Sequence, residues 1–239
     1  MSLFLSIVIP AYNEEGRILP SLERIDAYLA GQDYPAEVLV SDDGSRDETT
    51  KVVEVFAADH PNVRLIRNPH RGKGAAVRAG MLAARGDYRF LCDADLSMPI
   101  EEVSRFLPPA LTDADVALGS REAAGARRYD EPIHRHLMGR IFNTVVRLVA
   151  VGGFNDTQAG FKCFRAEAAE WLFSRQRIDG FGFDVEVVYL AVKRGYRVVE
   201  VPINWYHVPS SRVDPLRDSI RMFFEAFSVR LNDRRGLYR

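Results

Sequence analysis

The sequence predicts an α/β fold, a single domain with a mostly parallel central sheet flanked by helices. Short apolar runs of strand length alternate with longer helical patterns through the first half of the chain, as they do in βαβ units. Of the 239 residues, 47% are hydrophobic, which is enough to bury a sizeable core. No repeat, low-complexity tract or linker divides the chain, so we expect one domain.

The elements of the first half follow from composition and periodicity. Five apolar runs predict strands, at residues 5–10, 37–41, 63–67, 88–92 and 116–119. Helical patterns lie between the first four of them, at residues 20–30, 47–58 and 74–84. Pro20 suits a first helical turn, and Ser45 is a candidate cap for the second helix. Strands that alternate with helices run parallel, and helices then cover both faces of the sheet.

The second half of the chain is less regular. Residues 121–131 are polar and predict a mobile loop, whereas residues 133–151 predict a helix. Two shorter helices are expected, one around Trp171 and one at residues 184–193, before a final strand at residues 197–201. The tail shows helical spacing of its apolar residues, which are Leu216, Ile220, Phe223, Phe224, Phe227 and Leu231.

Bulk composition excludes several classes of protein. The formal net charge of -1 offers no basic surface for nucleic acid. Two cysteines are too few for a disulfide framework or a zinc site, and they fit a reducing compartment. The amino terminus lacks the features of a signal peptide, and no apolar run reaches the roughly 18 residues that span a bilayer. We therefore expect a cytoplasmic chain without a transmembrane segment.

Polar segments follow four of the predicted strands, and they hold the candidate site. These segments are residues 10–14, 42–45, 71–74 and 93–95. In open α/β sheets, ligands bind outside the carboxyl ends of the strands, where such loops converge. We therefore expect the four segments to line one pocket.

Asp93 and Asp95 are the chemical centre of this prediction. Carboxylates two residues apart at a strand end can face one hard divalent cation, and Mg²⁺ or Mn²⁺ prefers such oxygen ligands. The cation would neutralise charge on a leaving diphosphate. The alternative is a solvated turn, since such a triplet arises by chance, but its position after the apolar run 88–92 favours the metal site.

Three further loops offer contacts to a nucleotide. Asp42 and Asp43 fit a turn, but two adjacent acids also suggest that one accepts hydrogen bonds from a base or ribose. Tyr12 is either a stacking partner for a base or an ordinary half-buried aromatic. Lys73 lies between two glycines, yet the P-loop spacing is absent, which argues against a P-loop kinase or ATPase. The glycines would let the backbone approach a ligand at a helix amino terminus.

Two arginines are candidates for binding phosphate. Arg121 follows the strand at 116–119, and Arg135 opens the next helical region. Guanidinium groups near a metal diphosphate site can bind phosphate oxygens through two parallel hydrogen bonds. Arg127 and Arg128 are better explained as solvated loop charges.

Together these residues resemble the family 2 glycosyltransferases of GT-A fold. The matching segments are IVIPAYNEE, SDDGSRDET, RGKGAAVRAG, DADLSMP, GSR, DTQAGFKCF, FGFDVEVVYLA and VPINWYHVPSSRV. They cover nearly the whole chain. The later ones look most like those of the dolichyl-phosphate β-glucosyltransferases, with the dolichol-phosphate mannose synthases second.

The resemblance implies a role for each candidate residue in a metal-dependent, inverting transfer from a nucleotide sugar. Asp93 and Asp95 would hold the metal. The expected donor-binding residues are Pro10, Tyr12, Glu14, Asp43, Lys73, Asp93 and Ala94. The expected catalytic residues are Asp95, Arg121, Arg135, Lys162 and Asp184, with the two arginines on phosphates. Gln158 and Lys162 would line the acceptor side.

The acceptor is predicted from chemistry as well as from the resemblance. A hydroxyl needs a general base, whereas a phosphomonoester is mostly dianionic at pH 7. The Glu-Asp motif of many relatives with hydroxyl acceptors is half missing, because Phe183 precedes Asp184. Asp184 would be either a base or a partner of the basic residues. The favoured reaction is a single hexose transfer to a polyprenyl (dolichyl or undecaprenyl) phosphate, from UDP-glucose or, second, GDP-mannose.

We also expect successive parts of the chain to have different functions. Residues 1–120 would form the nucleotide-sugar-binding half, 121–213 the acceptor-side half and 214–239 an amphipathic helix. That helix would be a peripheral membrane contact, would pack on the domain, or would contact a second subunit in a homodimer. The alternative functions are transfer to a soluble acceptor, a nucleotidyltransferase, and a non-catalytic nucleotide-binding protein.

Overall fold

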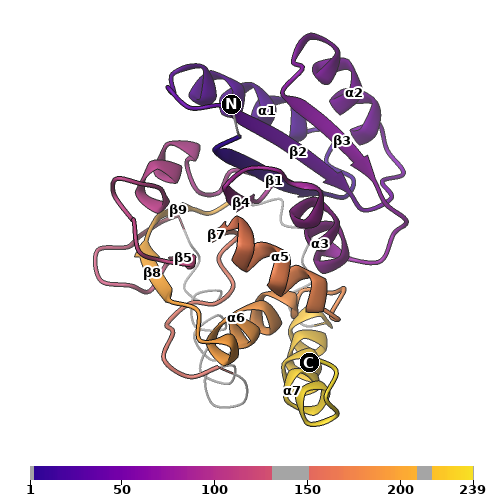
Figure 1. The fold of residues 1–239 in the computed structure, drawn as a ribbon. Helices are drawn as coiled ribbons and strands as arrows, with labels where there is room; N and C mark the ends of the chain where they lie inside the picture. Colours follow the sequence, from indigo (N-terminus) through magenta and orange to yellow (C-terminus); the bar gives the residue numbers. More distant parts are fainter. Residues whose placement is uncertain (1–2, 131–150, 209–216, 239) are drawn as a thin grey trace.

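The computed structural model describes residues 3–130, 151–208 and 217–238, and its core is one seven-stranded sheet (Figure 1). The strand order is β3-β2-β1-β4-β7-β5-β8. The strands are β1 (Leu5–Ala11), β2 (Ala36–Asp42), β3 (Val63–Arg67), β4 (Tyr88–Cys92), β5 (Val116–Ser120), β7 (Phe161–Arg165) and β8 (Val198–Pro202). All neighbouring strands pair in parallel except β7, which is antiparallel to both β4 and β5. The predicted mostly parallel α/β fold is therefore confirmed.

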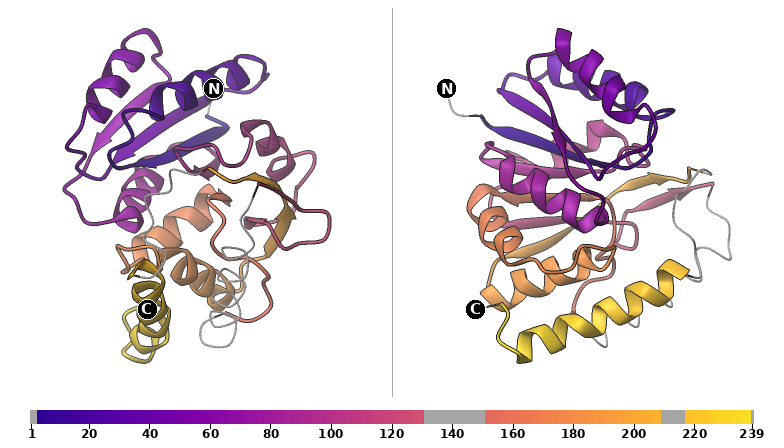
Figure 2. Two further views of the ribbon diagram at one scale, coloured as in Figure 1. Left: turned by 180° about the vertical axis from the view of Figure 1, so that it is seen from behind. Right: turned by 90° about the vertical axis from the view of Figure 1, so that its right-hand side faces the viewer.

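Helices cover both faces of this sheet. They are α1 (Ile18–Ala30), α2 (Thr49–Asp59), α3 (Lys73–Ala83), the 3-10 helix η1 (Ile100–Phe106), α5 (Ala166–Arg175), α6 (Phe183–Arg194) and α7 (Arg217–Arg234). Helices α1, α2 and η1 pack on one face, while α3, α5 and α6 pack on the other. Helix α7 lies outside α6 (Figure 2).

Strand β1 shows why its sequence is apolar throughout. Ile7 and Ile9 point into the core under α1 and α2, whereas Val8 between them packs under α3 on the opposite face. Every residue of the strand is buried. A strand with both faces covered needs apolar side chains at consecutive positions, and that requirement removes the alternation typical of half-exposed strands.

Three local expectations need correction. The sequence reading missed β7, because Lys162 interrupts its apolar run, and this strand supplies the sheet's antiparallel pairs. The expected loop at 121–131 contains β6 (Arg127–Tyr129), which pairs with β9 (Asn204–Tyr206). Ser45 does not cap α2, which begins at Thr49; its Oγ instead accepts a hydrogen bond from the Asn13 N–H at 2.9 Å. The helix expected at 133–151 lies almost wholly outside the described residues.

Candidate active site

The four polar segments meet at the carboxyl edge of the parallel strands. Strands β3, β2, β1 and β4 are consecutive neighbours, so the loops that follow them are adjacent. The Glu14 N–H donates to Thr49 Oγ1 at 2.7 Å, which joins the β1 loop to the segment after β2. Lys73 Nζ lies 2.6 Å from Asp93 Oδ1, which joins the β3 loop to the β4 loop. The expected convergence of the loops is therefore what the structure shows.

The two adjacent acids at the end of β2, Asp42 and Asp43, have separate structural tasks. Asp42 Oδ2 accepts hydrogen bonds from the N–H groups of Gly44 and Ser45, at 2.9 and 3.0 Å, and so closes the turn. The carboxylate of Asp43 binds the N–H groups of Arg71 and Gly72 at 2.9 Å each. Asp43 thus fixes the loop that carries Lys73, and its contact with a nucleoside stays a prediction.

An aromatic stack lies beside Asp43. The rings of Tyr12 and His70 are stacked with centroids 4.2 Å apart, and His70 Nδ1 lies 2.8 Å from Asp43 Oδ2. Flat rings at this edge form a surface on which a base can stack. The sequence reading named Tyr12 but missed His70, although His70 follows β3 and precedes the Lys73 loop.

The other predicted donor-side residues differ in accessibility. Pro10 is buried within β1, and Ala94 is buried with its carbonyl accepting a hydrogen bond from Ser21 Oγ at 2.6 Å. Glu14 holds Arg17, with 2.6 Å between its Oε2 and the guanidinium Nη2. A ligand contact to Pro10 or Ala94 would therefore involve mainly the backbone.

Lys73 and Asp93 form the central ion pair of this edge. Burial would lower the pKa of Lys73, but the charges of Asp93, Asp184 and Asp95 raise it. Burial would raise the pKa of Asp93, but the charge and hydrogen bond of Lys73 lower it. Both groups are therefore charged at neutral pH. A Cβ at Gly160 would lie 1.8 Å from Asp93 Oδ2, so this glycine makes room for the carboxylate.

The donor set at Asp93 and Asp95 fits a hard cation. Asp95 Oδ1 accepts hydrogen bonds from the Ser97 N–H and Oγ, at 3.0 and 2.7 Å, which orients its carboxylate. Across residues 3–130, 151–208 and 217–238, no three histidine, cysteine or acidic side chains cluster to hold a metal ion. A cation at this pair would need further oxygen ligands, such as those of a diphosphate and water, as Mg²⁺ sites commonly have.

A second, more deeply buried ion pair lies close enough to the first for their charges to interact. Lys162 on β7 is 1% exposed, and its Nζ donates to Asp184 Oδ1 and to the Ala159 carbonyl, each at 2.6 Å. Asp184 lies in the first turn of α6. Burial raises the pKa of Asp184, and the positive charges of Lys162 and Lys73 oppose that rise. Both residues were named from the sequence. Asp184 was expected to be either a general base or a partner of the basic residues, and the structure shows the contact with Lys162.

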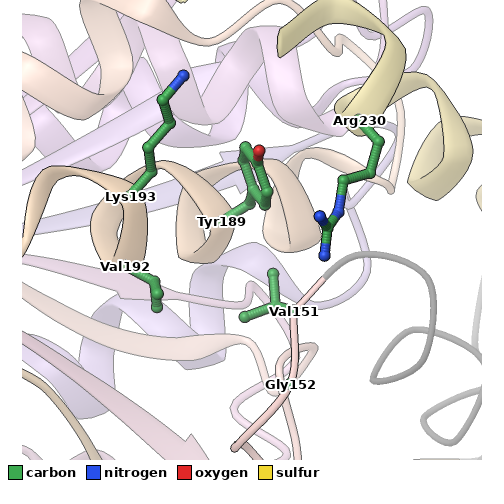
Figure 3. A pocket seen from close by; sticks show the side chains of 6 residues that line it. All are labelled: Val151, Gly152, Tyr189, Val192, Lys193 and Arg230. Atoms are coloured by element: carbon green, nitrogen blue, oxygen red, sulfur yellow. The ribbon is translucent and has the colours of Figure 1, made fainter. Parts of the chain in front are cut away.

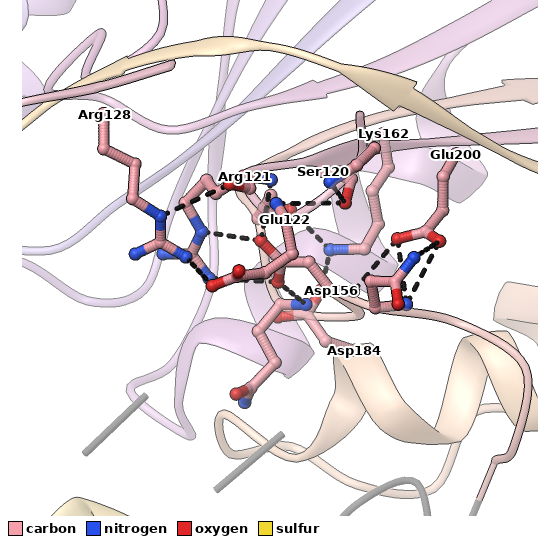
Figure 4. Close-up of polar contacts among 12 residues, drawn as sticks. Ser120, Arg121, Glu122, Arg128, Asp156, Lys162, Asp184 and Glu200 are labelled. Atoms are coloured by element: carbon pink, nitrogen blue, oxygen red, sulfur yellow. Dashed lines mark hydrogen bonds and ion pairs between the residues drawn. The ribbon is translucent and has the colours of Figure 1, made fainter. Parts of the chain in front are cut away.

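Arg121 is bound by an acid that the sequence reading did not select. Its Nε and Nη2 donate to the two carboxylate oxygens of Asp156, at 2.6 and 3.0 Å (Figure 4). Its guanidinium also lies 5.7 Å from the centroid of the Trp205 ring. Burial would raise the pKa of Asp156, but Arg121 and the Gln158 N–H lower it from 3.8 to about 2. Asp156 therefore fixes Arg121 and the backbone at Gln158.

The depressed pKa of Asp156 predicts an acid-sensitive contribution to stability. A carboxyl whose folded pKa is below its unfolded value stabilises the fold above the unfolded pKa, and this contribution disappears as the pH falls through the folded pKa. From 3.8 to about 2, the contribution is about 2 kcal/mol, and it is lost between about pH 4 and pH 2. Asp156→Asn should therefore lower the free energy of unfolding, measured in urea, at pH 5. At pH 2 this loss should be about 2 kcal/mol smaller than at pH 5. A difference independent of pH would contradict this assignment.

The predicted Arg135 is outside the residues that the structure describes. A pocket of about 270 Å³ lies between the later turns of α6 and α7 (Figure 3). It is lined by Val151, Gly152, Tyr189, Val192, Lys193 and Arg230, none of which is a predicted site residue.

The mostly parallel sheet, with acidic and basic side chains at its carboxyl edge, has the predicted GT-A fold, which solved glycosyltransferase structures share. The chain belongs to glycosyl transferase family 2, whose model matches residues 6–173. It is 34% identical to a dolichyl-phosphate beta-glucosyltransferase of Trichomonas vaginalis, over 99% of this chain and 73% of that protein. It is 33% identical to the Saccharomyces cerevisiae dolichyl-phosphate beta-glucosyltransferase, over 99% of this chain and 77% of that protein. Membership confirms the expected hexosyltransferase class.

Solved structures confirm the predicted fold. Glucosyl-3-phosphoglycerate synthase from Mycobacterium tuberculosis, in complex with Mn²⁺, UDP and phosphoglyceric acid, superposes with a TM-score of 0.67 at 21% identity. That match covers 96% of this chain and 78% of that one. Mannosyl-3-phosphoglycerate synthase from Rubrobacter xylanophilus gives a TM-score of 0.68 at 19% identity, covering 98% and 75%.

Proposed function

We propose that this chain transfers glucose from UDP-glucose to the phosphate of a polyprenyl phosphate, dolichyl or undecaprenyl, with inversion at the anomeric carbon. The observation that carries the proposal is its similarity to eight dolichyl-phosphate beta-glucosyltransferases, at 30–34% identity over 88–100% of this chain. In the reaction, an acceptor phosphate oxygen bonds to the anomeric carbon while the bond from that carbon to the diphosphate breaks, and UDP leaves.

The second ion pair supports a phosphate acceptor. A hydroxyl acceptor requires a general base, and Asp184 is the acid that the sequence suggested for that task. Its carboxylate is instead engaged by Lys162 Nζ at 2.6 Å in a buried pair. A phosphomonoester is already mostly dianionic at pH 7 and needs no base. Asp184 therefore suits the role of holding Lys162 better than that of removing a proton.

The edge of the sheet offers matched groups for the donor. The Tyr12–His70 stack would face the base, while Lys73 and Arg121 would face phosphate oxygens. Mg²⁺ or Mn²⁺ held by Asp93 and Asp95 would neutralise charge on the leaving diphosphate. In this proposal residues 1–120 bind the donor, while 121–213, with Gln158 and Lys162, serve the acceptor.

Helix α7 supports a membrane-bound acceptor. Its outward face exposes Phe223, Phe224, Phe227 and Leu231, beside exposed Arg221, Arg230, Arg234 and Arg235. Its two acids among the described side chains, Glu225 and Asp233, both accept hydrogen bonds from the domain, and Glu225 also pairs with Arg221 at 3.0 Å. An aromatic face bordered by arginines is complementary to an anionic lipid surface. No helix of the described residues is long and apolar enough to cross a membrane.

The exposed aromatics can be tested without removing the helix. Deleting the tail would remove Ala226 and Val229, which are part of the buried core, so substitutions on the outward face are cleaner. Phe224→Ser with Phe227→Ser should lower sedimentation with anionic vesicles at least tenfold, because two aromatic side chains leave the interface. Val55→Ser, an exposed apolar residue on α2, is the control. Unchanged sedimentation would contradict the membrane contact, and a shift from dimer to monomer would assign the face to a second copy instead.

The direct test is a transfer assay with radiolabelled sugar. We expect the label of UDP-glucose to pass to dolichyl or undecaprenyl phosphate in detergent, and to stop when the divalent cation is chelated. Transfer from GDP-mannose instead would show that the donor is GDP-mannose. Transfer to soluble phosphorylated acceptors alone would show that the acceptor is not a lipid. Release of diphosphate from a nucleoside triphosphate and a sugar phosphate would indicate a nucleotidyltransferase. UDP binding without any transfer would indicate a non-catalytic protein.

A further inference from the structure

The loop that precedes α6 is held by α7. The Gly182 N–H, at the N-cap position of α6, donates to Glu225 Oε2 of α7 at 2.7 Å. In a capping box, an acid at the third helical residue accepts this same N–H, but that position of α6 is Val185. Glu225 replaces the missing acid from another helix. Its negative charge also lies at the positive end of the helix dipole.

The sequence of this loop fits its contact with Glu225. A Cβ at Gly180 would lie 2.2 Å from Glu225 Oε1, and a Cβ at Gly182 would lie 2.5 Å from Glu225 Cβ. Neither glycine has a positive φ, so backbone conformation does not require glycine here. Glycine is needed at 182, where a Cβ would meet the stem of the Glu225 side chain, whereas at Gly180 it would meet only the carboxylate end of that side chain.

The opposite side of the same loop supports the segment that carries Lys73. A Cβ at Gly72 would lie 2.5 Å from the Asp179 carbonyl, and one at Gly74 would lie 2.8 Å from the Gly180 carbonyl. Arg71 and Asp179 form an ion pair at 2.6 Å. The loop is therefore packed between α7 and the Lys73 segment and contacts both directly.

We propose that Glu225 is a positioning residue for the glycosyl transfer. It holds residues 180–182 against the Lys73 segment and fixes the first turn of α6, which carries Asp184. Its effect on the donor rests on the proposed function, whereas its effect on the two loops does not. The contact between Glu225 and Gly182, which are 43 residues apart in the sequence, thereby orders the Lys73–Asp93 and Lys162–Asp184 ion pairs.

The test compares three variants of the full chain. Glu225→Ala removes the acceptor of the Gly182 N–H, and Glu225→Gln keeps an acceptor oxygen without the charge. Asp233→Asn is the matched control, since Asp233 also ties α7 to α6, accepting from the Tyr189 hydroxyl at 2.6 Å, but does not touch the loop. The measurements are amide hydrogen exchange at residues 72–75 and 180–183, and the KM and kcat of sugar transfer.

Glu225→Ala should speed exchange at both segments at least tenfold and raise the KM for the nucleotide sugar about tenfold, the lower end of what outer-shell partners contribute at metal sites. Glu225→Gln should keep the exchange rates and the KM close to those of wild type, and Asp233→Asn should change neither the exchange rates nor the KM. Unchanged exchange at 72–75 in Glu225→Ala would overturn the inference, as would equal effects in Asp233→Asn. Wild type that transfers no glucose would defeat the proposed function, and exchange would still decide the role of Glu225.

Discussion

Asp95→Asn should lower the rate of sugar transfer by about a thousandfold or more and leave the fold intact. The amide removes one of two carboxylates at the proposed metal site, and a bound cation supplies several kcal/mol of charge stabilisation to a leaving diphosphate. The side chain is partly exposed and bonded to Ser97 of its own turn. Its loss should therefore change the melting temperature little.

The measurement is the transfer rate across a Mn²⁺ titration, beside a thermal melt with and without UDP. Wild type should gain melting temperature with UDP and Mn²⁺ together by mass action, and Asp95→Asn should not. Asp113→Asn is a matched control, because Asp113 is an exposed carboxylate near the amino end of β5, paired with Arg197. Full transfer by Asp95→Asn without added metal would remove the metal from the proposal.

The parallel half of the sheet was predictable because its signals are local. Strand β1 is buried on both faces and so is continuously apolar, and the loops after β1 to β4 begin where the apolar runs end. Chain order alone then implies that the loops share an edge. The predicted Asp93, Lys73 and Asp43 accordingly fall within hydrogen-bonding distance of one another's loops.

The rest depended on contacts that a linear pattern does not encode. Strand β7 was missed because buried Lys162 reads as a surface residue until its partner Asp184, 22 residues away, is known. Asp156 reads as a turn residue until Arg121 is seen against it. Nothing near Gly182 in the sequence indicates that the stem of the Glu225 side chain packs against it. Each of these contacts joins residues that are far apart in the sequence.

Lys162→Met should have the largest effect on stability, a loss of about 3–5 kcal/mol at pH 7. Removing one partner of a buried ion pair leaves the other charge without compensation. Lys162 is 1% exposed and Asp184 is 5% exposed, so water cannot replace the lost contact. The loss should be measured by guanidinium unfolding, with Lys193→Met as the control. The exposed pair of Lys193 with Asp233 contributes no more than about 1 kcal/mol.

The pH dependence of this loss identifies its cause. Burial already raises the pKa of Asp184, and removal of Lys162 would raise it further. A raised carboxyl pKa in the folded state costs stability above the unfolded pKa, so the deficit of Lys162→Met should shrink on acidification from pH 7 toward pH 4. The double variant Lys162→Met with Asp184→Leu should regain most of the stability, since apolar replacements of a buried pair are often neutral. It should regain no transfer. A double variant that recovers both would show that the pair serves folding alone.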